Sequence, residues 1–157
     1  MKKPLIIAGD VCELTPERLR EMGVSAVLSD LDNTLAGYKD NVPDGAVAAW
    51  MKSLADAGIP LFIISNAKDG RVGAFCNPLG LPYIAKARKP RAQSLQKALG
   101  ELNVNPSAAV MLGDQFFTDV LAGGKAGVPV VLVPPRAKGI HFTLRRIFET
   151  PFIWWRR

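Results

Sequence analysis

Short apolar runs without internal alternation recur along this chain, and each is followed by a segment whose apolar residues have helical spacing. The runs cover residues 24–29, 60–65, 108–112 and 128–133, with a shorter extended piece at 83–84. Strands that are covered on both faces appear as unbroken apolar runs, and strands separated by helices pair in parallel. The sequence therefore predicts a three-layer, Rossmann-like α/β sandwich around a parallel sheet.

The segments between these runs carry helix signals. Asp44 is a candidate N-cap for a helix that ends near Gly58, and Thr15 followed by Pro16 is typical of another helix start. Pro90 is expected in the first turn of a further helix, because its fixed φ suits that position. Residues 116–126 are expected to be helical, since their apolar positions follow the helical period.

Length and composition favour one soluble domain over residues 1–157. The chain has 157 residues, 48% hydrophobic and 22% charged, which is enough apolar content for a core and too much for a disordered chain. No apolar run is long enough to span a bilayer, and the apolar start after Lys2 and Lys3 is too short for a signal peptide. We expect a cytoplasmic protein.

Cys12 and Cys76 are isolated, so bystander thiols are expected.

The net charge of +6 is concentrated near the C-terminus, where residues 136–157 include six Lys or Arg and one acidic residue. In the basic aromatic segment 139–157, Trp154 and Trp155 followed by two arginines suit a membrane interface. The segment could instead pack on the domain through its apolar stripe. We expect peripheral contact with an anionic membrane and no nucleic-acid binding, since no nucleic-acid motif accompanies the charge. An oligomer is compatible with the sequence.

Polar residues follow the apolar runs where the strands should end. Ligands of open parallel sheets bind beyond the carboxyl ends of the strands, so residues at these ends are expected to converge. Each cluster alone also fits an ordinary turn or helix cap. Together they provide carboxylates, hydroxyls and a lysine at one rim. The candidates are Asp30, Asp32, Thr34, Ser65, Asn66, Lys89, Asp114 and Asp119.

This set of side chains is the one that phosphoryl transfer needs. A carboxylate can attack phosphorus and form an aspartyl-phosphate, while a second carboxylate acts as general acid and base. The remaining requirement is to position the phosphoryl group and neutralise its oxygens. A lysine, a hydroxyl and a divalent cation with oxygen ligands, such as Mg²⁺, can do this.

The motifs resemble those of haloacid dehalogenase (HAD) superfamily phosphatases. Residues 30–35, Asp-Leu-Asp-Asn-Thr-Leu, match the opening D-x-D-x-T motif, and the other motifs follow in order. The resemblance implies that Asp30 is the nucleophile and Asp32 the general acid/base. It also implies that Mg²⁺ is held by Asp30, the backbone carbonyl of Asp32, and Asp114. By the same resemblance Ser65, Asn66 and Lys89 bind phosphate, and Thr34 and Asp119 support the site.

A cap domain, which many relatives insert over the site, has no room in this chain. Leu35 and Ser65 are 30 positions apart, and Ser65 and Lys89 are 24 apart, and the expected helices and strands fill both intervals. Members of the superfamily that act on carbon lack an acid at the position of Asp32, so the resemblance favours phosphate chemistry. An uncapped site is open to a large substrate or a surface.

A narrower resemblance is to the YqeG-type, subfamily IIIA branch, which is similar to phosphatidylglycerophosphate phosphatases. It is carried by residues 15–17, 30–35, 78–80, 87–90, 113–115 and 118–120, although Ser65-Asn66-Ala67 lacks a second asparagine often seen there. It implies a lipid phosphate substrate, a role in phospholipid metabolism and contact with the inner face of the membrane. The alternatives are a soluble phosphatase for nucleotides, sugar phosphates or phosphoproteins, and a non-enzymatic HAD-like binding module. The complete motif set argues against the latter.

Overall fold

A computed structural model describes residues 5–136 of the chain. Its centre is a sheet of six strands, all paired in parallel, in the order β1-β6-β5-β2-β3-β4. This confirms the predicted parallel sheet. The strands are β1 (Leu5–Ile7), β2 (Ala26–Ser29), β3 (Leu61–Ile64), β4 (Tyr83–Ile84), β5 (Ala109–Gly113) and β6 (Val130–Leu132).

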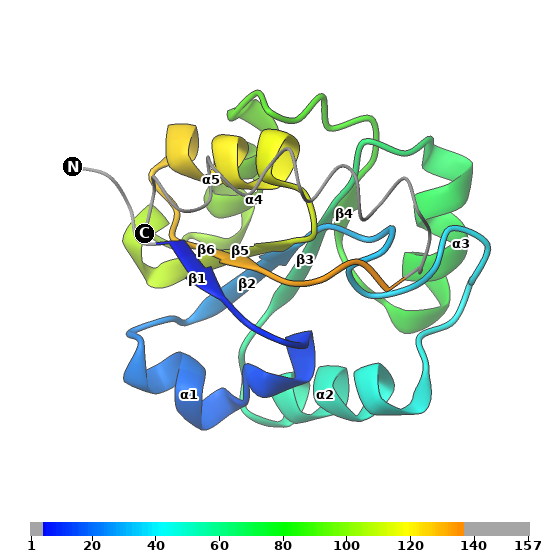
Figure 1. Ribbon diagram of the computed structural model, residues 1–157, viewed down its shortest axis with the longest axis horizontal. Coiled ribbons are helices and arrows are strands. Elements are labelled where there is room, and N and C mark those ends of the chain that lie inside the picture. Colours follow the sequence, from blue (N-terminus) through cyan, green and yellow to red (C-terminus); the bar gives the residue numbers. More distant parts are fainter. Residues whose placement is uncertain (1–4, 137–157) are drawn as a thin grey trace.

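Helices cover both faces of the sheet and complete the three layers (Figure 1). The larger core cluster includes apolar side chains of α1 (Pro16–Glu21), α2 (Gly45–Asp56) and α3 (Asp69–Leu79). The second cluster, on the opposite face, includes side chains of α4 (Gln93–Leu102) and α5 (Leu121–Ala126). Short 3-10 turns lie at Val11–Glu13 and Pro106–Ala108, and the π-helical turn η3 (Phe116–Val120) leads into α5.

Side-chain caps set the starts of two helices as predicted. The Asp44 carboxylate accepts a hydrogen bond from the Val47 N–H at 2.8 Å and begins α2. The Thr15 hydroxyl accepts from the Arg18 N–H at 3.3 Å and begins α1. These bonds satisfy N–H groups that have no partner within the helix.

Two segments differ from the sequence-based expectation. α4 begins at Gln93, so Pro90 does not lie in its first turn; the Lys89–Pro90 peptide is cis and the Arg91 N–H donates to the Arg88 carbonyl at 3.0 Å. A turn around the proline therefore precedes the helix. Residues 5–7, considered above only as a short apolar start, form the edge strand β1 beside β6. Three residues are too few to show a period.

The chain order of the strands reverses beside β2, because β3 lies on one side of β2 and β5 on the other. Open α/β sheets bind their ligands at such a switch point, beyond the carboxyl ends of the strands. The connections from β2 to α2 and from β3 to β4 hold no inserted domain, so the predicted absence of a cap is confirmed for the described residues. In the described part of the chain, no helix is long and apolar enough to cross a membrane.

Candidate active site

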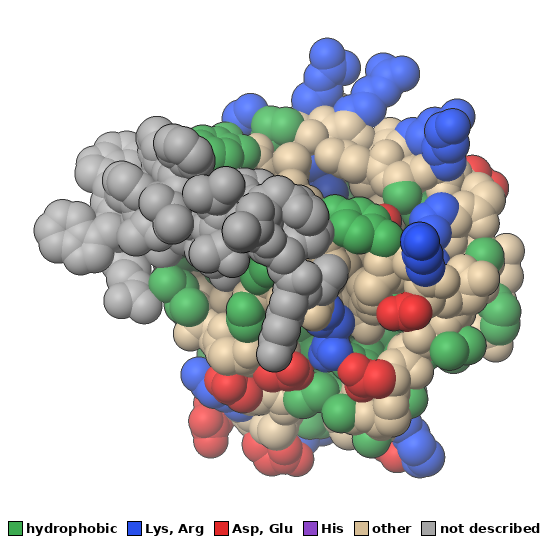
Figure 2. All heavy atoms as spheres, turned by 45° about the vertical axis from the view of Figure 1, so that its right-hand side comes forward, with side chains coloured by type: hydrophobic (Ala, Val, Ile, Leu, Met, Phe, Trp, Pro, Cys, Tyr) green, Lys and Arg blue, Asp and Glu red, His purple; other side chains and the backbone are tan. Residues whose placement is uncertain are grey.

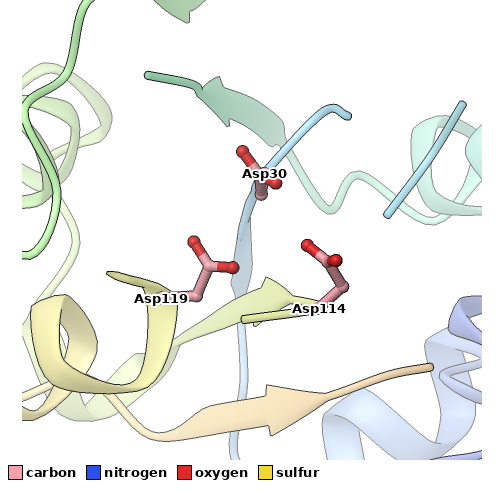
Figure 3. Close-up of side chains that lie close together, drawn as sticks. All are labelled: Asp30, Asp114 and Asp119. Carbon is pink, nitrogen blue, oxygen red and sulfur yellow. The ribbon is translucent and has the colours of Figure 1, made fainter. Parts of the chain in front are cut away.

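Three carboxylates lie close together beyond the ends of β2 and β5 (Figure 3). Asp30 directly follows β2, Asp114 directly follows β5, and Asp119 lies in η3. One oxygen from each lies within 4.8 Å of the others, and all three residues are buried. The sequence thus predicted correctly that residues from separate strand ends converge on one rim.

Lys89 holds two of these carboxylates. Its Nζ lies 2.8 Å from Asp30 Oδ1 and 2.7 Å from Asp119 Oδ1, and its side chain is only 1% exposed. Burial alone would lower the pKa of the Lys89 ammonium, but the charges of Asp119 and Asp30 outweigh that effect and raise it. Lys89 is therefore a permanent cation that fixes Asp30 from one side.

Three buried carboxylates gather at this point, those of Asp30, Asp114 and Asp119, and the Lys89 ammonium contacts the first and the last. Burial raises the pKa of Asp119 to about 6, against the opposing effect of Lys89. Buried carboxylates that lie this close together repel one another, so the cluster suits a further cation. Carboxylate oxygens are the ligands that a hard divalent ion such as Mg²⁺ prefers, and the residues fit such an ion.

The two oxygens of Asp119 already have partners within the protein. Oδ1 accepts from Lys89, and Oδ2 accepts from the Gln115 N–H at 3.1 Å. Gly113 makes this arrangement possible, since a Cβ added there would overlap the Asp119 side chain. Asp119 consequently contacts Lys89 at one oxygen and the backbone at the other, and the supporting role predicted for it stays a prediction.

The loop after β2 is a tight turn around the Leu31 carbonyl. That oxygen accepts from the N–H groups of Thr34, Leu35 and Ala36 at 3.2, 2.9 and 3.3 Å, and Asn33 has a left-handed φ of 64°. The Thr34 side chain is buried within this turn, and its hydroxyl has no hydrogen-bond partner among residues 5–136. The turn directs Asp30 and Asp32 toward different neighbours.

Asp32 contacts Arg71, a residue that the sequence analysis did not single out. Arg71 Nε donates to Asp32 Oδ1 at 3.1 Å, and Arg71 Nη2 lies 2.9 Å from the same oxygen. Burial raises the pKa of Asp32, although the Arg71 guanidinium opposes this. The sequence shows only that Arg71 lies near the start of the helix after β3, whose end belongs to the site. No motif distinguishes this arginine from the other basic residues.

Ser65 and Asn66 directly follow β3 and lie beside the lysine loop, which is the segment 85–92 between β4 and α4 that carries Lys89. Ser65 is buried, and its hydroxyl accepts from the Ala67 N–H at 3.1 Å. The Asn66 amide binds the backbone of Lys89 twice: Oδ1 accepts from the N–H at 2.8 Å, and Nδ2 donates to the carbonyl at 3.1 Å. Asn66 therefore fixes the lysine loop to the end of β3, and phosphate binding by its side chain stays a prediction.

Arg136 also belongs to this region, although the sequence analysis counted it with the basic C-terminal residues. Its Nη1 lies 2.6 Å from Asp44 Oδ2, and its Nε donates to the Thr34 carbonyl at 3.0 Å. Its backbone N–H donates to the Asn33 carbonyl at 2.9 Å. Arg136 thus fastens the turn after β2. The segment 139–157, for which membrane contact was predicted, lies outside the described residues.

The cysteines take no part in the site. Cys76 is buried in the larger core cluster and Cys12 packs against it, and neither forms a disulfide. Burial raises the pKa of the Cys12 thiol to about 11 and that of Cys76 to about 12. Both thiols are protonated at neutral pH, as expected for bystanders.

The comparisons with known proteins agree with this geometry. The family model described as "Hydrolase: haloacid dehalogenase-like hydrolase" matches residues 12–127. A Bacillus subtilis protein named "Probable phosphatase YqeG" is 35% identical over 136 residues, covering 87% of this chain and 79% of the relative. The D-glycero-beta-D-manno-heptose-1,7-bisphosphate 7-phosphatase of Pasteurella multocida is 30% identical over 129 residues, covering 79% of this chain and 66% of the relative.

Solved structures show the same fold at lower sequence identity. CbbY from Rhodobacter sphaeroides, in complex with phosphate, matches with a TM-score of 0.61 at 17% identity over 74% of this chain and 90% of that chain. The cobalt-bound deoxy-D-mannose-octulosonate 8-phosphate phosphatase (YrbI) of Haemophilus influenzae matches with a TM-score of 0.56 at 16% identity over 82% of this chain and 89% of that chain.

Proposed function

Because the chain belongs to the haloacid dehalogenase-like hydrolase family, we propose that it is a phosphatase that hydrolyses phosphomonoesters through an aspartyl-phosphate at Asp30. The observation that carries this proposal is the buried contact of Lys89 with Asp30 and Asp119 beside Asp114, at the switch point of the sheet. The arrangement presents one carboxylate for attack and surrounds it with groups that neutralise a phosphate.

In the first step an Asp30 oxygen attacks phosphorus, and the bond from phosphorus to the leaving oxygen breaks. The hydrogen bond from Lys89 to Asp30 Oδ1 leaves Oδ2 as the attacking atom. Asp32, two positions further along the chain, donates a proton to the leaving alcohol. In the second step water attacks the phosphoryl group and Asp32 accepts a proton of that water. The bond from phosphorus to the Asp30 oxygen breaks, which frees the Asp30 carboxylate and releases inorganic phosphate.

The remaining residues have supporting roles in this proposal. Asp30, the backbone carbonyl of Asp32, and Asp114 would hold Mg²⁺. The ion would offset negative charge on the phosphoryl oxygens when bound. The Ser65 hydroxyl and the Lys89 ammonium would bind the phosphoryl group. Asp119 keeps Lys89 oriented toward Asp30, and Thr34 braces the loop.

We further propose that the chain belongs to the YqeG-type, subfamily IIIA branch and that its substrate is a lipid phosphate, phosphatidylglycerophosphate. The similarity to the Bacillus subtilis protein and the uncapped site support this. The loops after β3 and β4 also carry exposed cations that suit an anionic surface, namely Lys68, Lys86, Arg88 and Arg91. Figure 2 shows lysine and arginine side chains gathered along the upper part of one face of the molecule.

A soluble phosphomonoester is the second candidate, because the Pasteurella multocida relative is named for a sugar phosphate. A substrate panel separates the two. Initial rates should be measured with phosphatidylglycerophosphate in mixed micelles and with a sugar phosphate, a nucleotide and a phosphopeptide. The proposal expects the highest kcat/KM for the lipid. A higher value for a soluble compound would favour the alternative, and no turnover of any of them would contradict phosphatase activity.

Deletion of residues 152–157 tests the proposed membrane contact of the C-terminal segment. Basic residues near an anionic leaflet contribute about 1 kcal/mol each, and interfacial tryptophans add to this. The shortened protein should therefore bind anionic vesicles more weakly in a co-sedimentation assay. Its turnover of the lipid should fall more than its turnover of a small soluble phosphate. Equal losses on both substrates would mean that the segment supports the domain instead.

A further inference from the structure

We propose that Arg71 is a positioning residue that holds the Asp32 carboxylate in place for proton transfer. The inference rests on the proposed function, because it presumes that Asp32 is the general acid and base. Arg71 lies in the first turn of α3, on a different element from the turn that carries Asp32. Its role would therefore be to fix, from outside, a side chain that its own loop does not fix.

The guanidinium of Arg71 joins three separate groups. Its Nε and Nη2 contact Asp32 Oδ1 at 3.1 and 2.9 Å, and Nη2 also donates to the Gly37 carbonyl at 2.9 Å. Nη1 donates to Asn41 Oδ1 at 3.3 Å. All three nitrogens are engaged, so the rigid planar group has its orientation set by the backbone and by Asn41 as well as by Asp32.

The segment 37–41 is itself a closed turn, which gives Arg71 a firm anchor. The Gly37 N–H donates to Asp40 Oδ2 at 3.1 Å, and the Asp40 N–H donates to the Gly37 carbonyl at 3.1 Å. A Cβ at Gly37 would meet the Asp40 carboxylate at 2.6 Å, so a larger residue there would require the exposed Asp40 side chain to move. Arg71 consequently links α3 to this turn across the Asp32 side chain.

Separate cations keep the two carboxylates of the loop apart. Lys89 contacts Asp30, and Arg71 contacts Asp32; within residues 5–136 neither cation forms an ion pair with the other aspartate. Both Arg71 and Asp32 are largely shielded, with side chains 18% and 15% exposed. Without Arg71, the Asp32 carboxylate would be free to rotate into solvent or toward Lys89. Proton transfer requires the donor within hydrogen-bond reach of the leaving oxygen, so such rotation should slow that step.

The test compares two leaving groups in the full-length protein. An alkyl phosphate such as glycerol 2-phosphate needs a proton on its leaving oxygen, whereas p-nitrophenyl phosphate needs little help. We expect Arg71→Gln to lower kcat/KM, which reports the steps up to cleavage of the leaving-group bond, by about tenfold or more for the alkyl phosphate and by less than about threefold for the aryl phosphate, since general acid catalysis contributes roughly 10²–10⁴-fold. Arg71→Lys should restore part of the lost alkyl activity.

Two further variants serve as the positive and the negative control. Asp32→Asn should show the same leaving-group pattern with a larger loss. Lys52→Gln removes an exposed ion pair with Asp56 on α2, at 2.7 Å, and should leave both rates unchanged. Equal losses of kcat/KM on both substrates in Arg71→Gln, or no loss on either, would overturn the positioning role while leaving the phosphatase proposal intact. Absence of turnover of both substrates by the wild type would overturn the proposed function and this inference with it.

Discussion

Asp30 and Asp32 are two positions apart on one turn, yet each meets a different cation, Lys89 or Arg71. The local sequence places two carboxylates on one turn, and the tertiary fold gives each of them a different partner. The family resemblance placed Asp30 and Lys89 in the same predicted site. The second contact, that of Asp32, comes from an arginine with no sequence signature, because its partner lies 39 positions away.

Gly113 provides a test of how the fold positions Asp119. Gly113→Ala should lower activity sharply, because the added Cβ would displace the carboxylate that orients Lys89. Overpacking a buried position also costs about 1–3 kcal/mol of stability. Both effects can be measured, by kinetics with a phosphomonoester and by urea unfolding.

Gly100→Ala is the matched control for this substitution. Gly100 lies within α4, and a Cβ there would meet nothing within 4 Å. Alanine should be neutral or stabilising by up to about 1 kcal/mol at such a site, with activity unchanged. A fully active Gly113→Ala variant would show that Asp119 does not need its observed position.

Most elements were predictable because their signals are local. Unbroken apolar runs predicted β2, β3, β5 and β6, and Asp44 and Thr15 marked helix starts that the structure confirms. The start of α4 was predicted wrongly. Pro90 lies in a turn before the helix, next to Lys89, whose backbone is bound by Asn66 from the end of another strand. β1 was missed because its only sequence signal is three apolar residues, and its pairing with β6 is a long-range contact.

The residue that caps α2, Asp44, also contacts an arginine that binds the turn after β2. Asp44 caps the helix at Val47 and also binds Arg136, which holds the turn after β2. Asp44→Ala should destabilise the protein by about 1–2 kcal/mol through loss of the cap. Asp44→Asn should keep the cap, so it should destabilise the protein less than Asp44→Ala does. Chemical denaturation of both variants checks this; equal destabilisation would mean that the ion pair with Arg136 dominates.

At the scale of the whole molecule, the sheet order brings three carboxylates and one lysine to a single point. We predict that activity is lost with a chelator and restored by Mg²⁺. Because an ion that binds only the folded state stabilises it, Mg²⁺ should also raise the midpoint of thermal unfolding. Asp114→Ala should abolish this stabilisation. Full activity in excess chelator, or an unchanged unfolding midpoint with Mg²⁺, would contradict the assigned metal site.

In the proposed mechanism Asp30 attacks the substrate, and trapping of the phospho-enzyme tests this step. The wild-type protein is mixed with a phosphomonoester, quenched in acid during turnover and mapped by peptide mass spectrometry. We predict one phosphoryl group, located by fragmentation on Asp30. None should be found in Asp30→Asn, which is nearly isosteric and should remain folded but inactive. A phosphoryl group on another residue, or near wild-type turnover by folded Asp30→Asn, would contradict the account.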